Sequence, residues 1–254
     1  MSNGEYYTPA ITWWESFSND FYQNFIYDDR WQWMLNGLWI TLQVSVIGIL
    51  LGIVLGIIIA VMRMTKVDFF HKFGLGFLDK ISNWLLFWIS YVYLDIIRGT
   101  PAVTQLLIWH FAIRPILGVD PIVTAMIAIG INSSAYVAEI IRAGVLSIDK
   151  GQTEAGRTLG LSTFTTMATI VMPQAVKNIL PTLVNEFIVL IKETAILGFA
   201  ALDDLNRAAR HITANTLDVW TPLVVAAIMY YIVIKILTIF LRMLERRLRK
   251  ADVR

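Results

Sequence analysis

Charged and amide side chains stand out in this sequence because they lie within long apolar stretches. Asn132 and Glu139 are seven residues apart, so a helix would place them on nearly the same face. Glu139 also precedes Arg142 by three residues, a spacing at which an ion pair forms within one helix. In a membrane, each such ionisable residue is costly to bury and marks a candidate functional site.

A second group of polar residues occurs later in the chain, at Lys192, Glu193 and Thr194. In a helix, Glu186 and Glu193 would share one face, and Lys192 would lie beside it. Ammonium, carboxylate and hydroxyl groups placed together are suited to a small polar ligand that carries charges of its own. A structural role is the alternative, in which Lys192 neutralises Glu186 or Glu139 across a bundle.

Gln105 is a further polar residue in an apolar stretch, and His110 lies five residues after it, so the two side chains point in different directions. The sequence has no metal-spaced cluster of His, Asp and Glu, no glycine-rich phosphate loop and no nucleophile with a plausible base. It also has no cysteine. We therefore expect no metal site, no bound cofactor and no ATP hydrolysis by this chain.

A short polar segment, about 147–173, separates two apolar stretches like an elbow. Ser147 or Asp149 could cap a short helix that runs through Leu159, because both side chains accept hydrogen bonds from backbone amides. Gly160 suits the left-handed residue that ends such a helix.

The middle of this elbow is rich in small residues. Ala155 and Gly156 leave a patch that a partner surface can approach closely, and Glu154 and Arg157 flank it with charge. Loops of this kind carry function more often than they carry stability. The alternative is an ordinary connection between two helices.

The composition indicates a membrane protein. The chain has 254 residues, of which 57% are hydrophobic and 16% charged, and its mean hydropathy is +0.62. Soluble domains carry about 25% charged residues. Runs of 18 or more apolar residues recur, which predicts several transmembrane helices rather than one buried core. The net charge of +2 is too small to indicate a nucleic-acid partner.

We therefore expect an all-α, polytopic membrane helical bundle. Five apolar stretches account for the spans, at about 35–62, 83–114, 121–145, 181–199 and 220–244. Pro121 is at a favourable helix start. Four small residues spaced four apart in the first span predict a packing face, and these are Gly48, Gly52, Gly56 and Ala60.

The second of these stretches is ambiguous because it is too long for one perpendicular span. Arg98-Gly99-Thr100-Pro101 interrupts it, and proline breaks the hydrogen-bond ladder of a helix. Two short spans, or one span with an interfacial helix leading into it, are both compatible with its length.

The distribution of basic residues decides between them. With one span here, fourteen basic residues share a side with the elbow, against four on the other side; with two spans the counts fall to ten against eight. The fourteen are Arg63, Lys66, Lys72, Lys80, Arg142, Lys150, Arg157, Lys177, Arg242, Arg246, Arg247, Arg249, Lys250 and Arg254, and the four are Arg30, Arg114, Arg207 and Arg210. The positive-inside rule favours five spans, with the N-terminus outside and the C-terminus in the cytoplasm.

These spans divide the chain into three parts. Residues 1–34 form an extracytoplasmic segment rich in tryptophan, tyrosine and phenylalanine, which suits a membrane–water interface. Residues 35–245 form the transmembrane domain, and residues 246–254 form a basic cytoplasmic tail. Such a chain belongs in the cell membrane, as a multi-pass protein.

The elbow resembles the EAA loop of ABC-importer permeases in the residues Glu154-Ala155-Gly156, Gly160 and Ile170-Val171-Met172-Pro173. That family pattern is Glu-Ala-Ala, three residues, Gly, nine residues, then Ile-x-Leu-Pro, and the spacing agrees throughout. Gly156 stands where alanine is usual and Met172 where leucine is usual, and both changes keep the residue small or apolar.

Other motifs resemble the polar amino-acid branch of these permeases. They are Arg98-Gly99-Thr100-Pro101, the run from Ser134 to Gly144, and Ile191-Lys192-Glu193-Thr194-Ala195. The resemblance implies a type I importer permease core of five spans. Its partners would be a second permease subunit, identical or homologous, two ABC ATPase subunits that hold ATP and magnesium, and a separate solute-binding protein.

The resemblance also implies roles for individual residues. The elbow would be the coupling helix that docks into the ATPase, and the residues that match or adjoin its motif are Gln152, Glu154, Ala155, Gly156, Arg157 and Gly160. The polar residues of the spans become candidates for the substrate path, and these are Gln105, Asn132, Glu139, Lys192, Glu193 and Thr194. Lys192 and Glu193 could bind the carboxylate and the ammonium of an amino acid, and we expect Asn132 to line the path and Glu139 to be structural.

Two other functions fit part of this pattern. One is an importer permease for another small zwitterion or organic solute. The other, of a different class, is a secondary transporter or channel, which would need its own gating or ion-coupling site, and no inverted repeat of broken helices supports it. A membrane-embedded enzyme would need a catalytic constellation that the sequence lacks.

Overall fold

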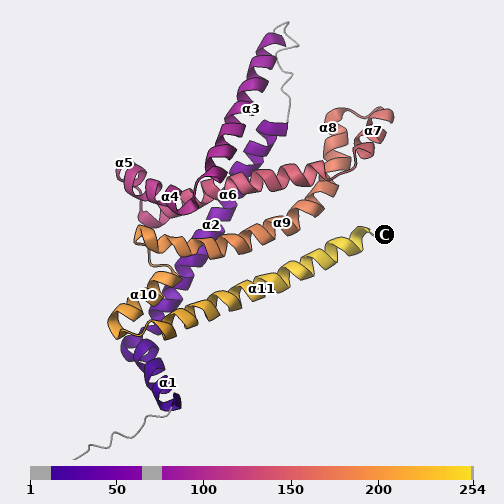
Figure 1. Ribbon diagram of the computed structural model, residues 1–254. Coiled ribbons are helices and arrows are strands. Elements are labelled where there is room, and N and C mark those ends of the chain that lie inside the picture. The colour runs from indigo at the N-terminus through magenta and orange to yellow at the C-terminus, as the bar shows by residue number, and fades with distance from the viewer. Residues whose placement is uncertain (1–12, 65–75, 253–254) are drawn as a thin grey trace, which may run out of the picture.

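The computed structural model describes residues 13–64 and 76–252, and within these ranges it contains helices and no strand. The chain therefore has the predicted all-α class. Its longest helices are α2 (Trp31–Met64) and α11 (Trp220–Asp252), which diverge from neighbouring points in Figure 1. Residues 1–12 of the aromatic N-terminal segment, and Lys66 and Lys72 of the first basic loop, lie outside the described residues.

Helix α2 packs along α6 (Pro121–Leu146) through its small residues. A Cβ atom added at Gly48, Gly52 or Gly56 would lie 2.9, 2.9 and 2.7 Å from side-chain atoms of residues 129, 133 and 137 respectively. Because the partner position advances by four each time, the two helices run in the same direction in a fixed register. The predicted packing face of the first span is confirmed.

The second apolar stretch forms two helical pieces that follow one another. Helix α3 (Gly76–Gly99) ends at the Gly99–Pro101 break, and three short elements, α4 (Ala102–Leu107), η4 (Ile108–Ile113) and α5 (Arg114–Leu117), carry the chain on. The break lies beside the middle of α6, since Leu94 of α3 packs with Ala135 and Ala138.

The elbow consists of α7 (Lys150–Thr158), α8 (Thr163–Thr166) and η5 (Met167–Val171). It reverses the chain, so that α9 (Met172–Glu193) returns alongside α6. Helices α6 and α9 pack closely at Gly144, because a Cβ atom there would overlap the side chain of Ile179.

The predicted start of the fourth span at Pro181 is wrong. Helix α9 begins at Met172 and has Pro173 in its first turn, where a missing N–H costs nothing. Pro181 lies inside the helix, where it removes one backbone hydrogen bond without ending the helix. The predicted end at Phe199 is also too late, because α9 gives way after Glu193 to a 3₁₀ turn, η6.

Beyond η6 (Thr194–Ala200), the chain folds over the start of α2 as helix α10 (Leu205–Thr216). The side chain of Asp204 caps α10 by accepting hydrogen bonds from the backbone amides of residues 206 and 207. A Cβ atom at Gly37 would lie 2.8 Å from the Asp204 carbonyl oxygen, so α10 rests directly on the backbone of α2.

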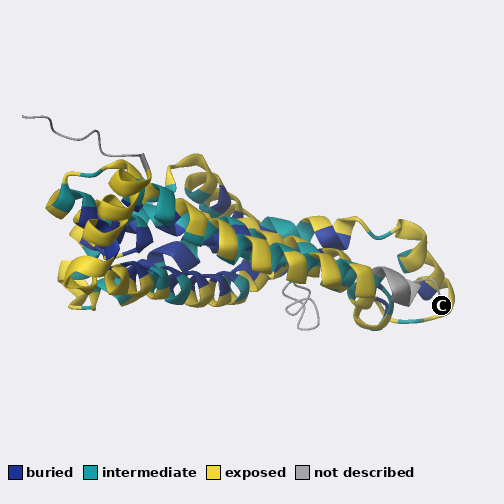
Figure 2. Ribbon diagram, turned by 90° about the horizontal axis from the view of Figure 1, so that it is seen from below, coloured by how far each residue is buried: buried dark blue, intermediate teal, exposed yellow. Residues whose placement is uncertain are grey.

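Both ribbon views place the elbow and the C-terminus at one end of an elongated molecule and α1 (Trp13–Phe21) and α10 at the other (Figures 1 and 2). In Figure 2 the buried residues gather in the half that carries α10, whereas the elbow end is mostly exposed. The elbow therefore projects away from the packed core.

Three of the described helices are long and apolar enough to cross a membrane, and they are α2, α6 and the part of α11 from Trp220 to Leu248. The bounds of α6 match those predicted for the third span to within one residue, and α2 and α11 contain the stretches predicted for the first and fifth. Helices α3 and α9 have 24 and 22 residues, which corresponds to about 36 and 33 Å. Both carry charged residues and fall outside that set, so five spans remain a prediction.

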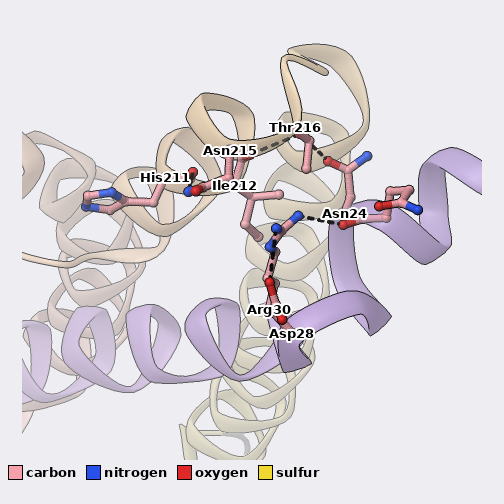
Figure 3. Close-up of polar contacts among 8 residues, drawn as sticks. Asn24, Asp28, Arg30, His211, Ile212, Asn215 and Thr216 are labelled. Carbon is pink, nitrogen blue, oxygen red and sulfur yellow. Dashed lines mark hydrogen bonds and ion pairs between the residues drawn. The ribbon is translucent and has the colours of Figure 1, made fainter.

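The segment before α2 is hydrogen-bonded to the end of α10 and to the connection between α10 and α11. Asn24, which is only 1% exposed, donates to Asp218 (2.7 Å) and accepts from the hydroxyl of Thr216 (2.8 Å; Figure 3). Phe25 packs beside it in a cluster with residues of α2, α10 and α11. The buried Arg30 donates to the Gln23 carbonyl (2.8 Å), which holds this turn closed.

Candidate functional site

The elbow helix α7 is closed at both ends by its own sequence. The Asp149 carboxylate accepts from the Gly151 amide (2.6 Å), as expected for a capping residue. At the other end Gly160 has φ +80°, and its amide and that of Leu161 donate to the carbonyls of residues 157 and 156. This pair of bonds is a Schellman motif, and the predicted cap and left-handed glycine are both confirmed.

The exposed face of α7 carries most of the predicted coupling residues. Gln152, Glu154, Ala155 and Arg157 are exposed at the projecting end of the molecule. The Arg157 guanidinium donates to the Thr163 hydroxyl (2.9 Å), which holds this cation against the elbow. Ala155 therefore sits on an open surface flanked by polar side chains.

Gly156 is buried and faces the interior of the elbow. A Cβ atom there would lie 2.7 Å from Thr166 Cγ2 and 3.1 Å from Ile170 Cδ1. The buried side chain of Thr166 thus occupies the space that an alanine methyl would need. An alanine here, as in the EAA pattern that the elbow resembles, would therefore crowd Thr166 and Ile170.

A polar cavity of about 480 Å³ lies along the facing sides of α6 and α9 and reaches the end of α3. We call it the polar groove. Its volume lies within the range of about 300–1,000 Å³ that is typical of small-molecule sites. Its lining residues are Arg98, Tyr136, Glu139, Ile140, Ala143, Gly144, Ser147, Asn178, Thr182, Asn185 and Glu186.

Glu139 is the centre of an ion-pair cluster in this groove. Both of its carboxylate oxygens accept from Arg142, as the spacing of the two residues predicts, and Arg63 Nη1 lies 3.5 Å from Oε2. The second pair joins the end of α2 to α6. Within the described residues, no ion pair joins Glu139 to Lys192.

Gln105 and Asn132 meet at the break in the second stretch. Pro101 has no N–H to give to the carbonyl of Ile97, and Gln105 Nε2 donates to that carbonyl instead (2.8 Å). The same nitrogen lies 2.8 Å from the hydroxyl of Thr100, and Asn132 Nδ2 donates to Gln105 Oε1 (3.0 Å). Asn132 of α6 thus holds Gln105, and Gln105 in turn holds the end of α3 at the break.

The remaining candidates lie at the end of α9. Lys192 is exposed and Glu193 is half-buried, whereas Thr194 is fully buried and donates to the Ile191 carbonyl (2.7 Å). Of the six residues assigned to the substrate path from sequence, only Glu139 lines the polar groove.

Sequence reasoning missed two charged residues of the groove as site residues, Arg98 and Glu186. The available signal was a polar stripe on α9, since Asn178, Thr182 and Asn185 recur at helical spacing and precede Glu186. Within the described residues, no group of three or more His, Asp or Glu side chains could hold a metal ion.

The chain is similar to known transport proteins over most of its length. Residues 52–250 match the family described as "Binding-protein-dependent transport system inner membrane component". The arginine transport system permease protein ArtQ of Bacillus subtilis (strain 168) is 39% identical over 221 residues, which cover 86% of this chain and 94% of that protein. The putative glutamine transport system permease protein GlnP of Rickettsia typhi is 35% identical over 217 residues, covering 85% and 92%.

Solved structures agree with these sequence relatives. The structure of an amino acid ABC transporter with histidines superposes with a TM-score of 0.74 at 34% identity and covers 85% of this chain and 94% of that one. An inward-facing MetNI methionine ABC transporter gives a TM-score of 0.70 at 17% identity, covering 85% and 96%, which supports the fold alone. The overall fold is thus shared with these proteins, and the chain belongs to the family of inner membrane components of binding-protein-dependent transport systems, the permeases of ABC importers.

Proposed function

We propose that this chain is the membrane-spanning subunit of an ATP-driven importer for polar amino acids, and that its elbow couples transport to a separate ATPase. The observation that carries the proposal is the geometry of α7. Its exposed face presents Ala155 at the end of the molecule, while Gly156 packs inward. A short rigid helix with a small-residue face is suited to entering a groove on a partner.

The partners follow from the family. We propose two ABC ATPase subunits, which bind ATP and magnesium, a second permease subunit of the same or a homologous chain, and a solute-binding protein on the outer side. The surrounding partner is the lipid bilayer, and no nucleic acid is involved. The chain itself binds no cofactor in this proposal.

A polar amino acid is the substrate that the relatives and the groove both favour. The relatives are named for arginine and glutamine. The polar groove offers groups of both charge signs together with amide and hydroxyl groups. An importer for another small zwitterion remains the second candidate, because the same groups would also bind such a solute.

Uptake into liposomes tests this function. The full complex, reconstituted with its ATPase and binding protein, is expected to accumulate labelled L-arginine or L-glutamine only when ATP is enclosed on the ATPase side. Omission of ATP is the control. Uptake that proceeds equally without ATP, driven by an ion gradient, would identify a secondary transporter instead.

We further propose that the elbow and the basic tail (246–254) face the cytoplasm, while the segment before residue 35 and α10 face outward, with residues 35–245 forming the five-span domain. A chain without cysteine allows a direct test. In sealed cells, an impermeant maleimide is expected to label Ala214→Cys on α10 but not Thr158→Cys on α7, both exposed positions. Permeabilised cells provide the control for reactivity, and labelling of position 158 from outside would overturn this orientation.

A further inference from the structure

We propose that Arg98 and Glu186 are the two groups of the polar groove that recognise the charges of the solute, Arg98 binding a carboxylate and Glu186 binding an ammonium or guanidinium. This inference rests on the proposed function. It assigns recognition to a pair of residues that the sequence motifs did not single out, and it makes the ligand an amino acid with both charges free.

Arg98 and Glu186 differ from Glu139, the third charged residue that lines the groove, in how they are paired. Within the described residues, neither has an ion pair or a hydrogen bond, whereas Glu139 is held by Arg142 and Arg63. A charge in a membrane domain is costly unless it is paired. Arg98 acts electrostatically on Glu139, but neither it nor Glu186 has a hydrogen-bonded charge partner within the described residues. Two charges of opposite sign in one cavity are therefore suited to a ligand that supplies such partners.

The environment of Arg98 keeps its hydrogen-bond donors available. Its guanidinium carbon lies 6.0 Å from the ring centroid of Tyr136, at the edge of the range for a cation–π contact. Such a contact orients the guanidinium but uses none of its N–H groups. A planar guanidinium with free donors is suited to binding a carboxylate through two parallel hydrogen bonds.

The position of Arg98 is fixed by the break that follows it. Gln105 donates to the carbonyls of Ile97 and Thr100, just before Pro101, and Asn132 holds Gln105 from α6. Arg98 also lines a second cavity, of about 420 Å³, together with Arg63, and so stands between the two spaces. We assign Gln105 and Asn132 as positioning residues, which act through Arg98.

The environment of Glu186 favours a cation. Glu193, which is also acidic, lies seven residues further along α9, and within the described residues no basic side chain is paired with Glu186. Asn185 lies next to it on the exposed side of the helix and lines the same groove. An ammonium or guanidinium entering here would be attracted by Glu186 and could donate to the neighbouring amide.

Binding to the purified permease–ATPase complex, without the solute-binding protein, tests the pair. The probes are labelled L-arginine and L-glutamine, and the competitor is agmatine, which is arginine without its carboxylate. Glu186→Gln is expected to weaken binding of the better probe about tenfold or more, because one charged hydrogen-bond partner is lost. Arg98→Gln is expected to do the same and to abolish the preference for arginine over agmatine, while Arg98→Lys retains part of it.

Lys235→Gln on α11 and Glu245→Gln are matched controls, since neither residue lines the groove, and both should bind like the unmodified chain. Unchanged binding in both Arg98→Gln and Glu186→Gln, with ATP-driven uptake intact, would overturn the pair and leave the proposed function standing. If Lys192→Gln weakened binding about tenfold while Arg98→Gln and Glu186→Gln did not, the proposal would be overturned and recognition would be assigned to the end of α9. Failure of all groove variants to assemble with the ATPase would make both residues structural, and absence of ATPase from the unmodified chain would defeat the proposed function itself.

Discussion

A permease carrying Ala155→Arg is expected to insert and pack normally but to lose its ATPase and its uptake activity together. Ala155 is exposed on a helix whose ends are fixed by Asp149 and Gly160, so the fold has no need of a small residue there. In a partner's groove, arginine would overpack the contact and bury an unpaired charge, each of which costs about 1–3 kcal/mol. On a free surface the same change costs within about 0.5 kcal/mol.

Co-purification of the ATPase and uptake by the same preparation measure this effect. Arg157→Lys is the first control, because it keeps the charge at the rim of the same helix. Ala201→Arg is the second, since it places the same side chain on an exposed alanine in the connection between η6 and α10. An Ala155→Arg chain that still co-purifies its ATPase and still takes up solute would contradict the coupling role of the elbow.

Gly56→Leu is expected to destabilise the bundle by disrupting the packing of α2 on α6. A Cβ atom at this position would lie 2.7 Å from Val137 Cγ1 and 3.0 Å from the backbone carbonyl of Ser134. The backbone atom cannot move without displacing α6, so the extra side chain must separate the two helices. Overpacking of this kind costs about 1–3 kcal/mol and occasionally more.

The midpoint of thermal unfolding in detergent, read by the loss of monodisperse protein, measures the effect. Gly56→Ala should show a smaller part of the same shift. Val54→Leu is the matched control on the same helix, since Val54 is 57% exposed and should tolerate the extra methylene. Equal midpoints for Gly56→Leu and Val54→Leu would mean that α2 and α6 do not pack in this register.

The elbow was the part of the structure that the sequence predicted best, because its geometry is local. Asp149 caps the helix that follows it, and Gly160 adopts the left-handed conformation that only glycine adopts without cost. Neither feature depends on distant residues. The small-residue face of α2 was predictable for a similar reason, since a spacing of four defines a helix face before its partner is known.

Helix ends and the groove were harder to predict because tertiary contacts decide them. Pro181 looked like a helix start, yet α9 continues through it while packed against α6. The polar groove joins residues from α3, α6 and α9, and no sequence spacing states that Arg98 and Glu186 line one cavity. The bond between Gln105 and Asn132 was equally hidden, because it depends on how the Pro101 break meets α6.

The composition of what purifies with this chain tests the central claim most directly. The tagged full-length chain, extracted from its own membranes in mild detergent, is expected to bring down an ABC ATPase in an amount equal to the permease, as identified by mass spectrometry. The preparation should hydrolyse ATP, and the chain stripped of that partner should not. A chain that purifies without any ATPase, yet transports its solute when reconstituted alone, would contradict the assignment as the permease of an ATP-driven importer.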